Sequence, residues 1–563
     1  MPPKISHLQF ADDSLLFFRA GQEQAEVIKS VLQSFERCTG QQINPAKCSV
    51  MFSEKCSNEL QAQVRNILHI DRAVFDAKYL GLPTPFGRMK GARFQHLKER
   101  LSKRLRDYTE KNMSAAAKEI LIKAIAQALP SYSMSVFKIP LGLCDDLTSI
   151  IREFWWGVEN GKKKMAWIAW EEMILKKCCG GMGFKDLRLF NQAMLARQAW
   201  RLIQYPESLR ARLLKAKYYP RGCLIDTAFC SNASAPWQAI LYGLDLLKQG
   251  IIWRVGNGSQ IRVWRDPWIP RDQSRRVISR KGSCRIRWVS ELLDIDGRDW
   301  DVGKLVQIFN PVDVEEILKI KIPGRAVEDL IAWHPEKTGL FTVRSAYNLA
   351  LKLKLGESTQ SSSSAPDGQR KLWWRVWSGQ VPPKGNVFIW KLAKDRLPTR
   401  RAKYVRNLEP SDICPLCNRE PESGFHATVS CPRAKGLRDA MREHWDLPEE
   451  DLFRFTGPDW LLILLDRCSA PVRDQVKLVL WKAWAIHNNI THQSGPTGIY
   501  DGVYALYAMQ TSLLEVSPKN CSVSDKGKEP APVHADRNHC CVAKKEQMKT
   551  VWNPLPLTGS RSM

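Results

Sequence analysis

The amino-acid sequence predicts an α+β protein built from several domains, and three observations lead to this prediction. With 563 residues, the chain is longer than the range that a single hydrophobic core usually serves. Apolar stretches typical of short strands occur at residues 5–18 and 77–87, whereas residues 23–40 and 88–130 carry apolar side chains at helical spacing. A Ser-rich segment at residues 356–370 lacks apolar anchors and predicts a linker.

Residues 5–18 predict a β-hairpin whose turn holds two adjacent carboxylates, Asp12 and Asp13. Mg²⁺ is a hard cation that takes a few carboxylates together with substrate phosphates, so the pair is a candidate Mg²⁺ site. Most such pairs are solvated turns, and this alternative stays open for the two residues by themselves. The helix expected over residues 23–40 ends at Gly40, a C-terminal stop.

A long basic helical region follows at residues 88–130. Its apolar stripe predicts an amphipathic helix and comprises Phe94, Leu97, Leu101 and Leu105. A basic helix can follow a phosphate backbone, so four of its residues are candidate nucleic-acid contacts, namely Lys98, Arg100, Lys103 and Arg104. The alternative is that these side chains form only the solvated face of an ordinary amphipathic helix.

The charge of the chain predicts a polyanionic partner. Lys and Arg number 85 against 58 Asp and Glu, which gives a formal net charge of +27 and favours sequence-nonspecific binding of RNA or DNA. A basic protein that binds no nucleic acid is the alternative from composition alone.

The 16 Cys are scattered, and neither a signal peptide nor a membrane-length apolar run is recognisable. We therefore expect an intracellular protein of the nucleus or cytoplasm, with no membrane association.

Residues 131–355 predict a mixed connector region to which the sequence assigns no chemistry. Within it, "GNGS" lies between alternating apolar positions and predicts a hairpin over residues 250–264. A compact Cys/His segment is expected at residues 371–445 and a helical segment at residues 446–514. The composition of residues 515–563 is polar, charged and Pro-containing, which predicts a disordered tail.

The Cys/His segment contains the pattern C-x2-C-x8-H-x4-C, formed by Cys414, Cys417, His426 and Cys431. Three thiolates and one imidazole complete a tetrahedral structural Zn²⁺ site, and four protein ligands leave no position open for catalysis. The alternative is that these four residues are unrelated and bind no metal, but the complete set of four ligands disfavours it. Nearby basic residues are candidate phosphate contacts or, equally, an exposed basic turn, and they include Arg400, Arg401 and Lys403.

Several of these blocks together resemble the reverse transcriptase of plant non-LTR (LINE-type) retrotransposons. "FADD" at Phe10 to Asp13 is similar to the metal-binding hairpin of the polymerase palm, and "KYLGLPTPFGR" at Lys78 to Arg88 is similar to the primer grip. "GQQINPAKCSVMF", "LIKAIAQALPSYSMSVFKIP" and "GFKDLRLFNQAMLARQAWRL" are also characteristic. The Cys/His segment, with its lead-in "LWWRVWSGQVPPKGNVFIWKLAKDRLPT", resembles the zinc-binding domain that follows the polymerase.

The resemblance implies an assignment of domains and sets an expectation about activity. Residues 1–87 would be a partial palm, residues 88–130 a thumb, and residues 371–445 the zinc-binding domain. Polymerases of this family take a further metal-binding Asp from an upstream strand, and only eleven residues precede Asp12. Asp12 and Asp13 would then be a vestigial Mg²⁺ pair, and we expect a truncated, retrotransposon-derived protein that is inactive alone.

Two other readings of the same resemblance stay open. The chain could be an RNA-directed DNA polymerase whose fingers and palm come from another chain or exon, and Mg²⁺ would then be its cofactor. It could also be a host protein that uses the zinc segment as an interaction module. "VWNPLPLTGSRSM" resembles the opening of an RNase H domain, but the acidic residues of such a domain are not present, so we expect no RNase H activity. The sequence predicts no oligomeric state.

Overall fold

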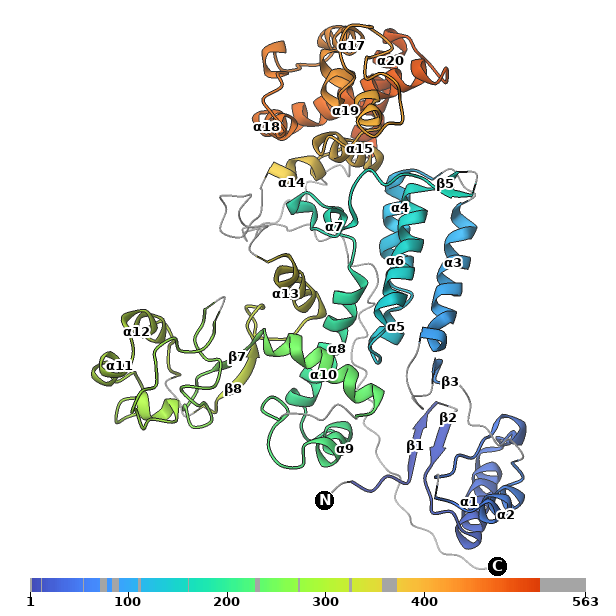
Figure 1. Ribbon diagram of the computed structural model, residues 1–563, viewed down its shortest axis with the longest axis vertical. Helices are drawn as coiled ribbons and strands as arrows, with labels where there is room; N and C mark the ends of the chain where they lie inside the picture. Colours follow the sequence, from blue (N-terminus) through green and yellow to red (C-terminus); the bar gives the residue numbers. More distant parts are fainter. Residues whose placement is uncertain are drawn as a thin grey trace, which may run out of the picture. The chain divides into compact units, whose positions relative to one another are not determined.

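Helices dominate the described part of the chain, and the strands found there pair in twos. The computed structural model describes residues 3–11, 13–53, 55–70, 78–83, 91–109, 113–159, 161–227, 233–271, 274–323, 327–356 and 372–516. The chain divides into two compact units after Met509, and of the second unit only residues 510–516 are described. Within the described residues, no helix combines the length and apolar character that crossing a membrane requires. Mixed helix and strand content agrees with the predicted α+β class (Figure 1).

The expected hairpin at the start of the chain is present. Strand β1 (His7–Phe10) pairs antiparallel with β2 (Asp13–Leu16), and Phe10 lies opposite Asp13. Helix α1 (Gln22–Thr39) ends where Gly40 takes a left-handed conformation with φ 71°, as the sequence predicts. Helix α2 (Asn58–Leu68) packs on α1. The smaller elements nearby are the 3₁₀ turn η1 (Pro45–Lys47) and the strand pair β3 (Lys78–Tyr79) and β4 (Leu82–Pro83).

The basic helical region forms two helices, α3 (Gln95–Thr109) and α4 (Ala115–Leu121), and α4 continues into the π-helical turn η3 (Ile122–Ala126). The four residues of the predicted apolar stripe are all buried, which confirms the amphipathic pattern. Helix α3 packs on α6 (Leu141–Trp156), and α4 also contacts α6. The remaining elements up to residue 180 are η2 (Gly91–Phe94), α5 (Ser131–Met134), β5 (Val158–Glu159), β6 (Lys162–Lys163), α7 (Trp170–Met173) and η4 (Lys177–Cys179).

Three helices form the core of the connector region: α8 (Leu187–Gln204), α10 (Ala235–Lys248) and α13 (Val343–Leu355). Both α10 and α13 pack across α8 (Figure 1). The crossing of α8 and α10 is close because Gly243 faces α8: a Cβ there would lie 2.2 Å from the backbone carbon of Leu195. Helix α9 (Leu209–Tyr218) adds Tyr218, whose ring stacks 4.3 Å from that of Trp237.

The hairpin predicted over residues 250–264 is wrong. Strand β7 (Ile251–Arg254) pairs antiparallel with the distant β8 (Leu330–Trp333) instead. The physical reason is the buried carboxylate of Asp329, which accepts hydrogen bonds from the backbone N–H groups of Gly256, Gly258 and Gln260 at 2.7–2.9 Å. These bonds fold the "GNGS" loop around Asp329, so the chain turns away from β7 and does not pair back on it.

A separate small core lies between β7 and β8 in the sequence. It contains the 3₁₀ turn η5 (Val289–Leu292) and helices α11 (Val302–Ile308) and α12 (Pro311–Leu318). The side chain of Asp313 is fully buried and accepts hydrogen bonds from Arg271 Nη2, from Ile278 N and from the Ser279 N–H and hydroxyl. Four donors thus join α12 to the extended segment before it. We call the part of the chain from residue 274 to residue 323 the Asp313 lobe.

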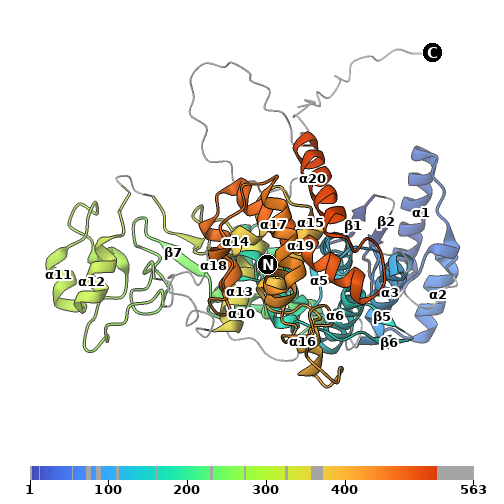
Figure 2. The same ribbon diagram turned by 90° about the horizontal axis from the view of Figure 1, so that it is seen from above.

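The remaining elements belong to the C-terminal region and surround the Cys/His segment. They are α14 (Leu372–Trp377), α15 (Pro383–Ala393), α16 (Arg400–Tyr404), the π-helical turn η7 (His426–Ser430), α17 (Pro432–Arg442), η8 (Glu450–Leu452), α18 (Trp460–Arg467), α19 (Ala470–Thr491) and α20 (Ile499–Val516). Helix α19 packs against α15, α17 and η7 (Figure 2). The indole N–H of Trp390 on α15 donates to Gly180 O at 2.9 Å, which joins this region to η4. Residues 357–370 and 517–563, on which the predicted linker and tail fall, lie outside the described residues.

We predict that Asp313→Asn destabilises the Asp313 lobe by about 2–4 kcal/mol at pH 7, because buried charge-assisted hydrogen bonds are lost and Arg271 keeps an unbalanced charge. Burial raises the pKa of Asp313, but hydrogen bonds from Ser279 and Arg271 outweigh it and hold that pKa below 3.8. The stabilisation by the ionised group is therefore present above about pH 4 and disappears as the pH falls through the folded-state pKa.

Hydrogen exchange of amides in the Asp313 lobe measures this effect. The exposed Asp296→Asn is the matched control and is expected to change the free energy of unfolding by less than about 0.5 kcal/mol. Equal protection in Asp313→Asn and the control at pH 7 would contradict the prediction, as would a difference that grows towards pH 3.

Candidate metal centre

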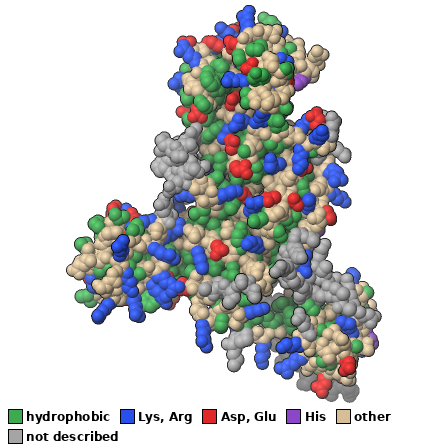
Figure 3. Space-filling view, viewed as in Figure 1, with side chains coloured by type: hydrophobic (Ala, Val, Ile, Leu, Met, Phe, Trp, Pro, Cys, Tyr) green, Lys and Arg blue, Asp and Glu red, His purple; other side chains and the backbone are tan. Residues whose placement is uncertain are grey.

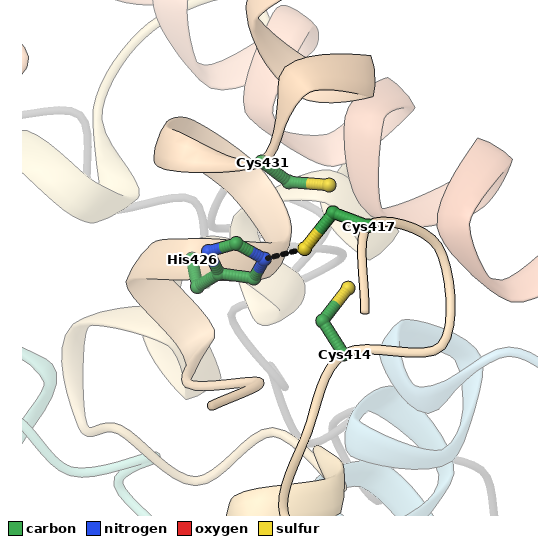
Figure 4. Close-up of side chains that lie close together, drawn as sticks. All are labelled: Cys414, Cys417, His426 and Cys431. Carbon is green, nitrogen blue, oxygen red and sulfur yellow. Dashed lines mark hydrogen bonds between the residues drawn. The ribbon is translucent and has the colours of Figure 1, made fainter. Parts of the chain in front are cut away.

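The structure brings together the four residues that the sequence pattern singled out. The sulfur atoms of Cys414, Cys417 and Cys431 and a ring nitrogen of His426 all lie within 4.8 Å of one another (Figure 4). Cys414, His426 and Cys431 are buried, and Cys417 is partly buried. The side chains are turned towards a common point, and Cys417 Sγ lies 3.4 Å from His426 Nε2.

A tight turn presents the first two sulfurs. Cys414 N donates to Glu420 O at 2.9 Å, and Asn418 N donates back to Cys414 O at 2.9 Å. Asn418 has φ 52°, a left-handed conformation that Asn tolerates better than most residues. An isolated bridge between Ile413 and Pro421 closes the base of the turn. Cys414 and Cys417 therefore face the same side of one short loop.

The other two ligand candidates lie at the two ends of the π-helical turn η7. His426 begins η7, and Cys431 ends it while serving as the N-cap of α17. Cys431 N donates to His426 O at 2.9 Å, five residues back, and Pro432 fits the first helical position because it needs no donor there. The wider π turn fixes the distance between the imidazole and the sulfur.

The ring of His426 is oriented by groups outside the cluster. Its Nδ1 lies 2.9 Å from Glu420 Oε2 and 3.0 Å from Ser430 Oγ, while its Nε2 faces the sulfurs. A carboxylate on the far nitrogen is the usual partner of a metal-binding imidazole, because it fixes the tautomer and raises the basicity of the ligating nitrogen. Glu420 is a residue that the sequence pattern did not identify.

Two members of the cluster, His426 and Cys431, have shifted pKa values. Burial acts to lower the pKa of His426, but hydrogen bonds and charges from Cys414 and Cys417 raise that pKa to about 9. A hydrogen bond from Cys414 lowers the pKa of Cys431 to about 7, aided by the backbone N–H groups of Arg433 and Ala434 in the first turn of α17. A metal ion that binds here would displace the protons of the thiols, because the thiolate is the ligand form.

The donor set fits Zn²⁺. Zn–S distances of about 2.3 Å and Zn–N distances of about 2.0–2.1 Å place the ligand atoms of a tetrahedral site roughly 3.5–3.8 Å apart, close to the spacing in this cluster. Thiolates and imidazole are poor ligands for Mg²⁺ or Ca²⁺. Four protein ligands complete the coordination of such an ion and leave no position open for a substrate. The site is therefore suited to stabilising the fold and not to catalysis at the metal.

A second group shares one residue with this cluster. Cys414, Glu422 and His487 also have ligand-type atoms within 4.8 Å of one another, and all three residues are buried. The sequence pattern missed Glu422 and His487, since His487 lies on α19, far along the chain, and no short motif links it to Cys414.

The other predicted site residues are dispersed. Asp13 is exposed at the hairpin turn, and Asp12 lies outside the described residues. On α3, Arg100, Lys103 and Arg104 are exposed, whereas Lys98 forms an ion pair with Asp146 at 3.1 Å.

Three further candidates lie around α16, close to the cluster. Arg401 is exposed, and Arg400 is partly buried. Lys403 forms an ion pair with Glu409 at 3.4 Å. Of these three candidates, Arg401 is therefore the one whose side chain is exposed.

Comparison with known proteins agrees with these features. Residues 341–437 match the family described as zinc-binding in reverse transcriptase. The chain is 28% identical over 353 residues to the Arabidopsis thaliana protein named "Putative ribonuclease H protein At1g65750", and the match covers 61% of this chain and 55% of that protein. It is 41% identical over 143 residues to the "Uncharacterized mitochondrial protein AtMg00310" of the same organism, and the match covers 25% of this chain and 93% of that protein. The chain therefore spans about half the length of the first relative.

We predict that the purified full chain holds one zinc ion and that Cys417→Ser lowers its zinc affinity by more than about 100-fold, because a hydroxyl is a much poorer zinc ligand than a thiolate. Elemental analysis after dialysis measures the zinc content. Cys223→Ser, which changes an exposed thiol outside the cluster, is the matched control and is expected to keep its zinc. A folded wild-type chain without zinc would contradict the prediction, as would an equal zinc content in the two variants.

Proposed function

Because the chain belongs to the family of retrotransposon reverse-transcriptase-related proteins, we propose that its C-terminal region is a zinc-stabilised module that binds nucleic acid. The single observation that carries this proposal is the convergence of three sulfurs and one imidazole within 4.8 Å. The finer assignment, a plant non-LTR element of the LINE type, is supported by the palm-like and primer-grip-like motifs and by the plant origin of both relatives.

The proposed zinc ion has a structural role that reaches the basic turn at α16. Glu422, in the loop between the ligands Cys417 and His426, accepts the Arg400 N–H on its Oε1 at 3.0 Å. The Arg401 N–H donates to the backbone oxygen of Glu422 at 3.2 Å. The loop that the ion would hold is therefore the same loop that positions Arg400 and Arg401.

Nucleic-acid binding by this chain would be electrostatic. The chain has a net charge of +27, and Lys and Arg side chains are spread over the visible face, including the lobe with α11 and α12 and the surface around α3 (Figure 3). Exposed guanidinium and ammonium groups on α3 and α16 suit phosphate oxygens, which position a nucleic acid without specifying its sequence. We therefore propose RNA or DNA as the partner, with binding that weakens as salt increases.

A second candidate function, RNA-directed DNA polymerase, is favoured by one observation: the β1–β2 hairpin forms and presents Asp13 beside its turn. Two-metal phosphoryl transfer places two ions about 3.5–4 Å apart between the attacking and leaving oxygens, and carboxylates from one turn do not supply both positions. We therefore propose that the hairpin on its own does not support synthesis and that Mg²⁺ is a cofactor only where other residues complete the site.

We predict that Arg401→Ala lowers the slope of log K against log salt by about 1, because one phosphate contact releases about one counterion. Fluorescence anisotropy of labelled single-stranded RNA and duplex DNA at several salt concentrations measures the slope. Lys248→Ala removes an equal charge from an exposed position on α10 and is expected to leave the slope unchanged. Equal slopes for Arg401→Ala and the wild type would contradict a phosphate contact at α16.

We predict no Mg²⁺-dependent extension of a primed RNA template by the chain alone, for the geometric reason given above. Gel analysis of primer length, with and without Mg²⁺, measures it. Extension that Asp13→Asn abolishes and the exposed Asp296→Asn preserves would refute this prediction and establish the polymerase.

A further inference from the structure

His487 and Glu422 form a buried polar pair directly beside the candidate metal centre. Their side chains are 5% and 4% exposed, and His487 Nε2 lies 3.4 Å from Glu422 Oε2. Ligand-type atoms of both residues are within 4.8 Å of Cys414 Sγ. Glu422 Oε2 and both ring nitrogens of His487 lack a well-formed hydrogen bond within the described part of the chain. Buried groups of this kind need a partner, and besides each other the group close to both of them is the sulfur of Cys414.

The position of His487 is fixed by packing. Its ring stacks on that of Trp484 one turn earlier, with 5.5 Å between centroids and 3° between planes. Helix α19 contacts α15, α17 and η7, and Leu480 on the same helix is fully buried. Beside the imidazole lies a cavity of about 10 Å³, bordered by Cys431, Ala434 and Ile486, which is too small for more than one water molecule. The ring therefore cannot turn to solvent to satisfy its nitrogens.

We infer that His487, held by Glu422, is a positioning residue that donates a hydrogen bond to the Cys414 thiolate, so that the metal centre extends to helix α19. The inference rests on the proposed zinc site. A zinc-bound thiolate retains negative charge, and an N–H donor in a dry environment stabilises that charge and lowers the tendency of the sulfur to leave the metal. Glu422 completes the arrangement because its carboxylate lies 3.4 Å from His487 Nε2, where its charge stabilises the imidazole as a donor.

This arrangement couples three parts of the C-terminal region. Glu422 bonds to the start of α16 through the Arg400 N–H, while it also contacts His487 on α19. Cys414 belongs to the first turn of the metal loop. The polar pair thus connects the loop, the basic turn and α19, although α19 lies outside the residues 341–437 that match the zinc-binding family.

Direct ligation by His487 in place of His426 is the competing geometry, and the chemistry disfavours it. His426 already has Glu420 on its far nitrogen, the kind of carboxylate partner that metal-binding imidazoles use. Its other nitrogen, Nε2, lies 3.4 Å from Cys417 Sγ. The four-ligand set is complete without His487. The two geometries differ in an observable way, because only a ligand changes the coordination number or donor set when it is removed.

The test uses the full chain with His487→Leu and His487→Gln, each loaded with Zn²⁺ and, separately, with Co²⁺. We expect His487→Leu to lower zinc affinity 10- to 100-fold, measured by competition with a chromophoric chelator, because the thiolate loses its donor. His487→Gln retains an N–H donor and should recover most of that loss. The Co²⁺ d–d bands should stay those of a tetrahedral S₃N site in both variants, while the thiolate-to-cobalt charge-transfer band shifts in His487→Leu alone.

Leu480→Ala is the matched control, because it loosens the packing of α19 without touching Cys414. It should leave the cobalt charge-transfer band in place, which separates a hydrogen bond to sulfur from general destabilisation. A wild-type chain that binds no zinc would overturn the proposed function itself. A wild type that binds zinc, with His487→Leu unchanged in affinity and spectrum, would overturn this inference alone. A cobalt spectrum of His487→Leu that no longer indicates a nitrogen ligand would also overturn the inference, because it would identify His487 as a direct ligand of the metal.

Discussion

The C-terminal region depends on one electrostatic constraint, the confinement of three cysteine sulfurs and one imidazole to a space under 5 Å across. Between α16 and η7, the structure describes no helix or paired strand beyond a single bridge, Ile413 to Pro421. A metal ion bound by these side chains would hold the ends of this loop together, because each ligand comes from a different part of it. Structural zinc contributes about 10–16 kcal/mol in small zinc domains, which is enough to order such a loop. The proposed ion would therefore stabilise the loop that presents its ligands.

Consequences of that constraint extend outwards through specific bonds. Cys431 is the N-cap of α17, so the cluster fixes where that helix starts. Arg438 on α17 is buried, donates to Val429 O at 2.7 Å and pairs with Glu450, which joins the π turn to η8. On the other side, Glu422 joins the loop to the basic residues of α16. The candidate metal-binding loop thus positions the proposed nucleic-acid contacts at α16. The proposed contacts on α3 are positioned by the apolar stripe that packs that helix against α6.

Local patterns in the sequence predicted the local features of the structure. Helical spacing identified the buried stripe on α3, Gly40 marked the end of α1, and the spacing from Cys414 to Cys431 identified a cluster that does converge. Features that depend on distant contacts were missed. The "GNGS" loop has a hairpin pattern, but Asp329 binds its N–H groups and β8 takes its place beside β7. His487 has no fixed spacing from Cys414, because only the packing of α19 brings the two together.

The central claim is that a metal ion at the cluster holds the C-terminal region together and positions α16. Hydrogen exchange of the full chain, measured before and after removal of zinc by a chelator, tests it most directly. The account predicts that chelation deprotects η7, the start of α17, the α16 turn and the His487 end of α19, while α8 in the connector core keeps its protection. Unchanged protection around Cys414 and His426 after complete zinc removal, or an equal loss of protection in α8, would contradict it.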